Sequence, residues 1–108
     1  MRHTIVENEA GLCITLEGEF DLYSCADLRK VLVARVQQDP LDIRLDCTGV
    51  DYIDSSGMGL IMQLHFLLKK SGHKLVLAGL SEQILKLFRA IKLDKALGAA
   101  IEPAQPEP

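Results

Sequence analysis

Four short segments of the chain carry the apolar and polar pattern of β-strands. Residues 4–7 and 12–17 are joined at residues 8–11, where Asn and Gly supply the turn conformations of a hairpin. Residues 41–47 (LDIRLDC) alternate apolar and polar side chains strictly, and residues 74–78 form a short apolar run. The pattern therefore predicts an opening β-hairpin followed by two further strands.

Apolar residues recur at helical spacing between and after these strands. A Ser24-x-x-Asp27 capping pattern predicts a helix start there, and Asp39-Pro40 ends that helix. We expect a second helix from the serine pair after Asp54 to Lys70, a third over residues 81–91, a last turn over residues 94–98 capped by Asp94, and a short edge strand over residues 99–101.

This order of elements predicts an α/β fold with a mixed, mostly parallel sheet. Strands that alternate with helices form crossover units, whose parallel strands end at one shared rim. Residues that follow the second and third strands should therefore converge there, although they are far apart in sequence. Polar Asp42, Arg44 and Asp46 on the alternate face of the third strand indicate that helices cover mainly one side of the sheet.

The stretch that joins the third strand to the second helix carries the candidate chemistry. Residues 51–60 read DYIDSSGMGL, so that Ser55 and Ser56 fall where the first helical amides lack internal acceptors. Serine at a helix start is most often a cap and nothing more. Two serines between an acid and Gly-Met-Gly are more than one cap needs, and this pattern favours a modification or docking site.

At these residues the chain resembles a known family, the STAS domains, and more narrowly the bacterial anti-sigma factor antagonists. Residues 18–21 (GEFD) are similar to the family's Gly-Glu-Leu/Ile-Asp, and residues 54–59 (DSSGMG) match its phosphorylation loop at each position. A weaker similarity runs from Gly79 to Asp94, where Lys92 stands in place of a common glycine. The resemblance covers the chain up to Glu102, so residues 1–102 are expected to form one STAS domain and residues 103–108 a mobile, proline-rich tail.

The resemblance implies a protein-binding switch without catalysis of its own. Its partners would be an anti-sigma factor serine kinase, which binds the unphosphorylated protein and phosphorylates it, and a serine phosphatase, which reverses the modification. The matched loop makes Ser55 the phosphate acceptor. The residues implied in partner binding are Asp21, Asp51, Asp54, Ser56, Gly57, Met58 and Gly59.

Composition and charge narrow the classes of function that the chain could have. A chain of 108 residues with 48% hydrophobic and 25% charged residues is typical of one globular domain. Its net charge of −3 and lack of a long basic run argue against a nucleic-acid partner. Three scattered cysteines (Cys13, Cys25 and Cys47) and no membrane-length apolar run predict a cytoplasmic protein with reduced thiols, no membrane association, no cofactor and no metal.

Other functions remain open from the residues alone. On the same fold, the chain could be a STAS subunit of a signalling or lipid-transport complex whose serine loop docks without phosphorylation. A receiver-like phosphotransfer enzyme would hold Mg²⁺ with the carboxylates, but its strand order and late lysine are not found. A serine hydrolase is disfavoured because G-x-S-x-G is absent and His3, His65 and His73 are scattered. On the second helix, we expect Met58 to face a partner and Phe66 to be buried.

Overall fold

The computed structural model describes residues 2–102, and the tail expected over residues 103–108 lies outside this range. The elements follow one another in the order β1 (Arg2–Asn8), β2 (Gly11–Phe20), α1 (Leu22–Gln38), β3 (Ile43–Ile53), α2 (Ser55–Lys70), β4 (Leu75–Ala78), α3 (Glu82–Ala90), α4 (Leu93–Leu97) and the 3₁₀ turn η1 (Gly98–Ala100). Within this range, no helix has both the length and the apolar character needed to cross a membrane.

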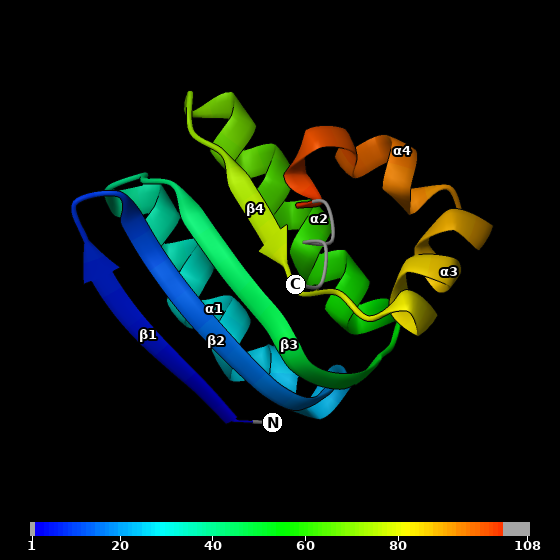
Figure 1. Ribbon diagram of the computed structural model, residues 1–108. Coiled ribbons are helices and arrows are strands. Elements are labelled where there is room, and N and C mark those ends of the chain that lie inside the picture. Colours follow the sequence, from blue (N-terminus) through cyan, green and yellow to red (C-terminus); the bar gives the residue numbers. More distant parts are fainter. Residues whose placement is uncertain (1, 103–108) are drawn as a thin grey trace, which may run out of the picture.

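The sheet has the strand order β1-β2-β3-β4 (Figure 1). β1 and β2 form the predicted antiparallel hairpin, with Asn8 opposite Gly11 at its turn. β3 lies parallel to both β2 and β4, because α1 and α2 each return the chain to the same end of the sheet. The prediction of a mixed, mostly parallel sheet is confirmed.

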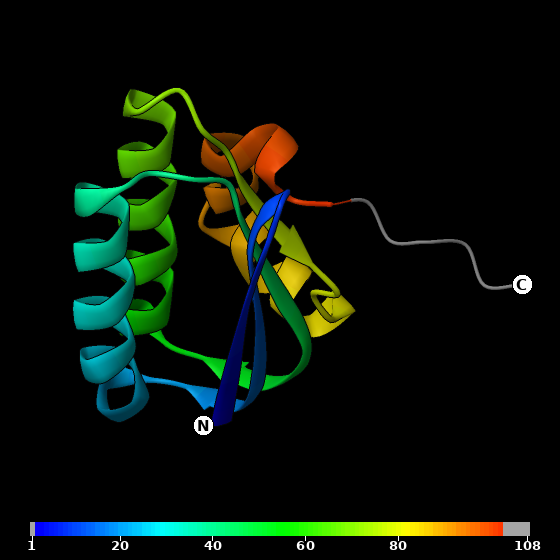
Figure 2. The same cartoon turned by 90° about the vertical axis from the view of Figure 1, so that its left-hand side faces the viewer.

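Helices α1 and α2 pack side by side on one face of the sheet, and α3 and α4 lie beside β4 (Figures 1 and 2). The core lies between this helical layer and the inward-facing strand residues. Its largest fully buried side chains are Phe20, Phe88, Ile14, Leu16, Leu28, Leu32, Ile43, Leu45, Leu60, Ile61, Leu64 and Leu68. The opposite face carries the exposed Arg44, as the alternation in the third strand predicts.

Helix α1 begins three positions before the predicted start. Its N-cap is Asp21, whose Oδ1 accepts hydrogen bonds from the N–H groups of Tyr23 (3.1 Å) and Ser24 (3.0 Å). The Ser24 hydroxyl in turn accepts from the N–H of Asp21 at 2.9 Å. Ser24 is therefore the third residue of a capping box and not the cap, so the Ser24-x-x-Asp27 interpretation was wrong.

Strand β3 is longer than the 41–47 segment, because it continues to Ile53 beside β2. The register between the two strands shifts at Thr15/Glu17 and again at Gly18/Glu19. Each shift breaks the strict alternation of buried and exposed residues. This alternation is the pattern that predicts a strand over residues 41–47, so the pattern does not extend to the rest of β3. The extension carries β3 to the same rim at which β2 ends.

The segment after α3 differs from the expected pattern. Lys92 has φ of 61°, in the left-handed region, and it precedes α4 without a side-chain cap, so Asp94 lies in the first turn and is not the cap. The expected strand over residues 99–101 is reduced to one parallel bridge between Ile101 and Leu77, because η1 occupies residues 98–100. The N–H of Glu102 donates to the Leu77 carbonyl at 2.9 Å.

Candidate functional site

The ends of β2 and β3 place the starts of two helices next to each other. Phe20 and Ile53, the last residues of these strands, are paired in the sheet, and the N–H of Asp54 donates to the Phe20 carbonyl at 3.2 Å. α1 begins at Leu22 and α2 at Ser55. We call this region, formed by residues 19–24 and 51–59, the rim. The predicted convergence of the two segments is confirmed.

Asp54 connects the two helices through its carboxylate. As the N-cap of α2, its Oδ1 accepts from the N–H groups of Ser56 (2.9 Å) and Gly57 (3.1 Å). Its Oδ2 accepts from the N–H of Leu22, the first residue of α1, at 3.1 Å. One side chain therefore satisfies main-chain donors of both helices that have no partner within their own helix.

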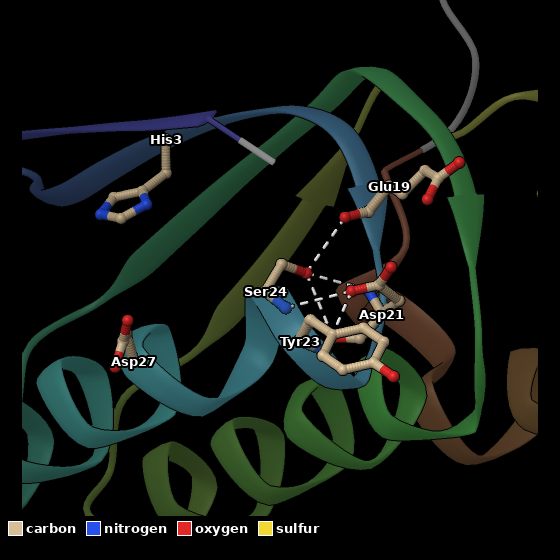
Figure 3. A pocket seen from close by; sticks show the side chains of 6 residues that line it. All are labelled: His3, Glu19, Asp21, Tyr23, Ser24 and Asp27. Atoms are coloured by element: carbon tan, nitrogen blue, oxygen red, sulfur yellow. Dashed lines mark hydrogen bonds between the residues drawn. The ribbon is translucent and has the colours of Figure 1, made fainter.

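Asp21 lies in a hollow of about 500 Å³ at the rim, shown in Figure 3. The hydrogen bond from the Ser24 N–H, followed by those from the Ser24 hydroxyl and the Tyr23 N–H, lowers the pKa of the Asp21 carboxyl below its usual value. Asp21 therefore carries its negative charge at neutral pH. The residues that line the hollow are His3, Glu19, Asp21, Tyr23, Ser24 and Asp27, of which three are acidic.

Ser55 is the first residue of α2 and is exposed. Its hydroxyl has no hydrogen-bond partner among residues 2–102, whereas the neighbouring Asp54 and Ser56 are both joined in the cap of the helix. Ser56 is half-buried. Of the two serines, Ser55 is the more exposed, and Ser56 joins the cap through its main-chain N–H.

The two glycines of the loop differ in environment. Gly57 is buried, and a Cβ built on it would lie 2.6 Å from the Phe20 carbonyl oxygen and 2.8 Å from a side-chain carbon of Ile53. Glycine at this position lets α2 approach the ends of both strands, so its role is close packing and not exposure to a partner. Gly59 is exposed, and a Cβ there would lie 3.8 Å from the guanidinium of Arg29 on α1.

The other residues predicted to bind a partner lie at or near the rim in different settings. Asp51 lies within β3 and is exposed, and its carboxylate makes no hydrogen bond to another of the described residues. Met58 is partly buried and packs against the core. Phe66 is 58% exposed, so the expectation of a buried Phe66 was wrong; α2 lies at the surface of the helical layer and leaves this side chain in solvent.

Sequence reasoning missed three exposed apolar side chains at the rim. Leu22 is 61% exposed and Tyr23 is 88% exposed at the start of α1, and Tyr52 is 53% exposed near the end of β3. Large apolar side chains that stay in solvent next to candidate chemistry are typical of a binding surface. Their position in the sequence could have pointed to them, because Leu22 and Tyr23 directly follow Asp21 and Tyr52 directly follows Asp51.

The rim combines carboxylates, a hydroxyl and exposed apolar side chains. Among the described residues, no three His, Cys, Asp or Glu side chains are grouped so that they could hold a metal ion. Ser55 has no histidine or other base bonded to its hydroxyl within residues 2–102, so nothing there activates it as a nucleophile. The arrangement can present a hydroxyl, several carboxylates and apolar side chains to another protein.

Comparisons with known proteins find relatives of this chain both in sequence and in fold. The chain is 36% identical over 84 residues to an anti-sigma-B factor antagonist of Bacillus subtilis (strain 168), an alignment that covers 78% of this chain and 76% of the relative. Two solved structures of the anti-sigma factor antagonist SpoIIAA share the fold. The unphosphorylated form has a TM-score of 0.77 at 20% identity, over 96% of this chain and 90% of that one. The phosphorylated form has a TM-score of 0.76 at 20% identity, over 96% and 92%.

The family assignment rests on a match over nearly the whole described chain. The family model described as "Mlab, STAS domain" matches residues 3–101, which include both strands that end at the rim and all of α2. Apart from Arg2 at the start of β1, the elements from the hairpin to η1 lie within the matched range. The chain belongs to the STAS domain family.

Proposed function

We propose that this protein is an anti-sigma factor antagonist: a protein-binding switch whose unphosphorylated form binds an anti-sigma factor serine kinase and whose phosphorylation at Ser55 releases that partner. The name of the Bacillus subtilis relative supports the class of function. The kinase supplies the catalysis, and a serine phosphatase restores the binding form.

The exposed, unpartnered hydroxyl of Ser55 is the observation that carries this proposal. A kinase must approach the acceptor oxygen closely, and at the first position of α2 the oxygen is not held by a hydrogen bond within residues 2–102. The helix start also presents the positive end of the helix dipole, which tolerates a phosphate. The modification therefore fits the isolated domain.

The same phosphate disfavours a bound partner. It adds roughly −1.5 to −2 charges at neutral pH, next to Asp54 and on the same rim as Glu19, Asp21 and Asp51. In water these charges repel one another weakly. In a closed interface the phosphate would lose its hydration, and an unpaired buried charge costs several kcal/mol, enough to lower affinity by orders of magnitude.

Leu22, Tyr23 and Tyr52 supply the apolar part of the proposed interface. The main-chain N–H of Leu22 bonds to Asp54, and Tyr52 lies opposite Glu19 in the sheet, so these side chains surround the capped helix starts. Exposed tyrosines anchor protein interfaces because they bury a large area with few rotatable bonds. A partner that covers them would also cover Ser55.

The test is to incubate the full chain with ATP and the anti-sigma factor kinase of the same organism, and to locate phosphate by mass spectrometry. We expect one phosphate on Ser55, none on a Ser55→Ala protein, and an undiminished rate for Ser56→Ala. Phosphate on Ser56 in the Ser55→Ala protein at the wild-type rate would contradict the acceptor assignment. Stable binding without any phosphorylation would instead favour a STAS subunit whose serine loop docks unmodified.

A further inference from the structure

A second cavity lies away from the rim, at the opposite end of β4, where α2 ends and α4 passes into η1 (Figure 1). Its volume is about 590 Å³, within the roughly 300–1,000 Å³ that is usual for small-molecule sites. Five basic side chains line it: His65 and Lys69 from α2, His73 and Lys74 before β4, and Lys95 from α4. The end of α2 with the segment that follows it, and α4 further along the chain, thus bring basic groups to one cavity.

The cavity is strongly basic in a chain whose net charge is −3. No Asp or Glu is among the residues that line it, and its three lysines take part in no ion pair within residues 2–102. Asp42 reaches only its margin, where its Oδ1 lies 3.1 Å from His73 Nδ1 and accepts from the Lys74 N–H at 3.1 Å. That contact orients the His73 ring and leaves the lysines uncompensated.

Leu75, which lines the cavity, has a main-chain N–H without a hydrogen-bond partner among residues 2–102. The Lys74 carbonyl accepts from Ile43 on β3, and the Leu77 carbonyl accepts from Glu102 on the other side of β4. Because alternate residues of a strand address the same edge, the N–H and C=O of Leu75 share the outer edge with Leu77. Leu75 is 2% exposed, and neither group has a hydrogen-bond partner within residues 2–102. Buried main-chain groups are nearly always paired, so this N–H is available to a ligand.

The remaining lining is apolar. Leu97 is 2% exposed, Ala100 is 7% exposed, and both contribute to the wall formed by α4 and η1. A ligand that fits must therefore combine a compact, strongly anionic group with a small apolar part. Three ammonium groups suit a dianion better than a single carboxylate, because each ammonium gains more from the larger charge.

We propose that this cavity binds a small organic phosphate monoester with a short apolar group. The phosphate oxygens accept hydrogen bonds from Lys69, Lys74 and Lys95 and from the Leu75 N–H, and the apolar group lies against Leu97 and Ala100. The site is independent of Ser55 and of the partner that binds the rim. A lipid phosphate presents the same chemistry from a membrane surface, and the experiment separates the two sources.

The test is an NMR titration of the ¹⁵N-labelled full chain with hexyl phosphate, inorganic phosphate and hexanoate. We expect saturable shifts of the Leu75, Val76 and 96–100 amides, with hexyl phosphate binding more tightly than either other probe. Lys95→Gln should weaken hexyl phosphate binding about threefold, while Lys70→Gln, a neighbouring lysine outside the cavity, should leave it unchanged. Both variants replace surface side chains and should keep the wild-type spectrum elsewhere.

Three outcomes would overturn the proposal. The first is the absence of saturable shifts at these amides, and the second is an equal weakening by Lys70→Gln, which would show nonspecific charge attraction. The third comes from vesicles of phosphatidylglycerol with phosphatidic acid: if the protein cosediments with them and hexyl phosphate displaces it, the ligand is a membrane lipid and not a free monoester.

Discussion

The carboxylate of Asp54 accepts a hydrogen bond from the main-chain N–H of Leu22 at 3.1 Å, across 32 positions of sequence. The same carboxylate caps α2, so the starts of α1 and α2 share one acceptor. A displacement of either helix start therefore changes the surroundings of Ser55. This contact links the two helix starts of the rim.

Replacement of Asp54 should separate capping from partner binding. Asp54→Ala removes the acceptor for three N–H groups and should lower the free energy of unfolding by about 1–2 kcal/mol. Asp54→Asn keeps one of the two acceptor oxygens, so it should lose less stability than Asp54→Ala while losing the charge that a partner meets. Urea unfolding and calorimetric titration with the kinase measure the two effects, with Asp21→Asn as the parallel variant at the start of α1.

If the Asn variants lose binding only in proportion to their loss of stability, both acids are caps and nothing more. The structure already gives each of them a capping role. A loss of binding that exceeds the loss of stability is the result that supports a place in the interface.

Tyr23→Ala should weaken kinase binding by about tenfold or more, without a change in melting temperature. The side chain is 88% exposed in the free protein, so its truncation removes almost no internal packing. Phe66→Ala is the matched control, since Phe66 is also a large exposed aromatic residue on a helix but lies three turns from Ser55. Equal effects of the two substitutions on affinity would place the interface elsewhere.

Lys92→Gly should stabilise the protein by about 1 kcal/mol. Lys92 holds φ of 61° where the STAS resemblance expects glycine, and a side chain disfavours that left-handed conformation. Lys86→Gly, in the interior of α3, removes the same side chain from a helix and should destabilise by about 1 kcal/mol. The melting temperatures of the two variants and of the wild type measure these changes in stability. A Lys92→Gly protein less stable than wild type would show that the lysine side chain makes a compensating contact.

Stability should fall at alkaline pH because of Cys47. Burial raises the pKa of its thiol from the usual value of 9.0 to about 12. The unfolded chain therefore releases this proton first, and the stabilisation that is complete below pH 9 is lost as pH rises toward 12, by at most about 1.4 kcal/mol per pH unit. The difference between wild-type and Cys47→Ala urea curves at pH 8, 9 and 10 measures this term; a difference independent of pH would show a normal thiol.

Much of the fold follows from local patterns in the sequence. The hairpin, the α2 helix from the serine pair to Lys70 and the α3 helix capped by Ser81 lie where periodicity and caps place them. The start of α1 could not be placed correctly, because Ser24 suits both a cap and the third position of a capping box. In the structure Asp21 is the cap, and the contact between Asp54 and Leu22 adds a further bond at this helix start.

The sequence indicated the polar residues of the site but not the exposed apolar residues beside them. Asp21, Asp54 and Ser55 were predicted through the resemblance to the STAS loop, and the structure brings these three residues to the same rim. Leu22, Tyr23 and Tyr52 were missed, because apolar residues near a strand or helix are assigned to the core unless their exposure is known. Gly57 was assigned to partner binding, whereas its approach to Phe20 depends on how α2 crosses the end of β2.

The affinity of the anti-sigma factor kinase for the full chain, measured by calorimetry before and after stoichiometric phosphorylation of Ser55, tests the proposed switch most directly. We predict that phosphorylation weakens binding by at least about 100-fold, while amide chemical shifts away from the rim stay unchanged. Equal affinity of the two forms, or shift changes spread through α1 and the sheet, would contradict a local electrostatic block at Ser55.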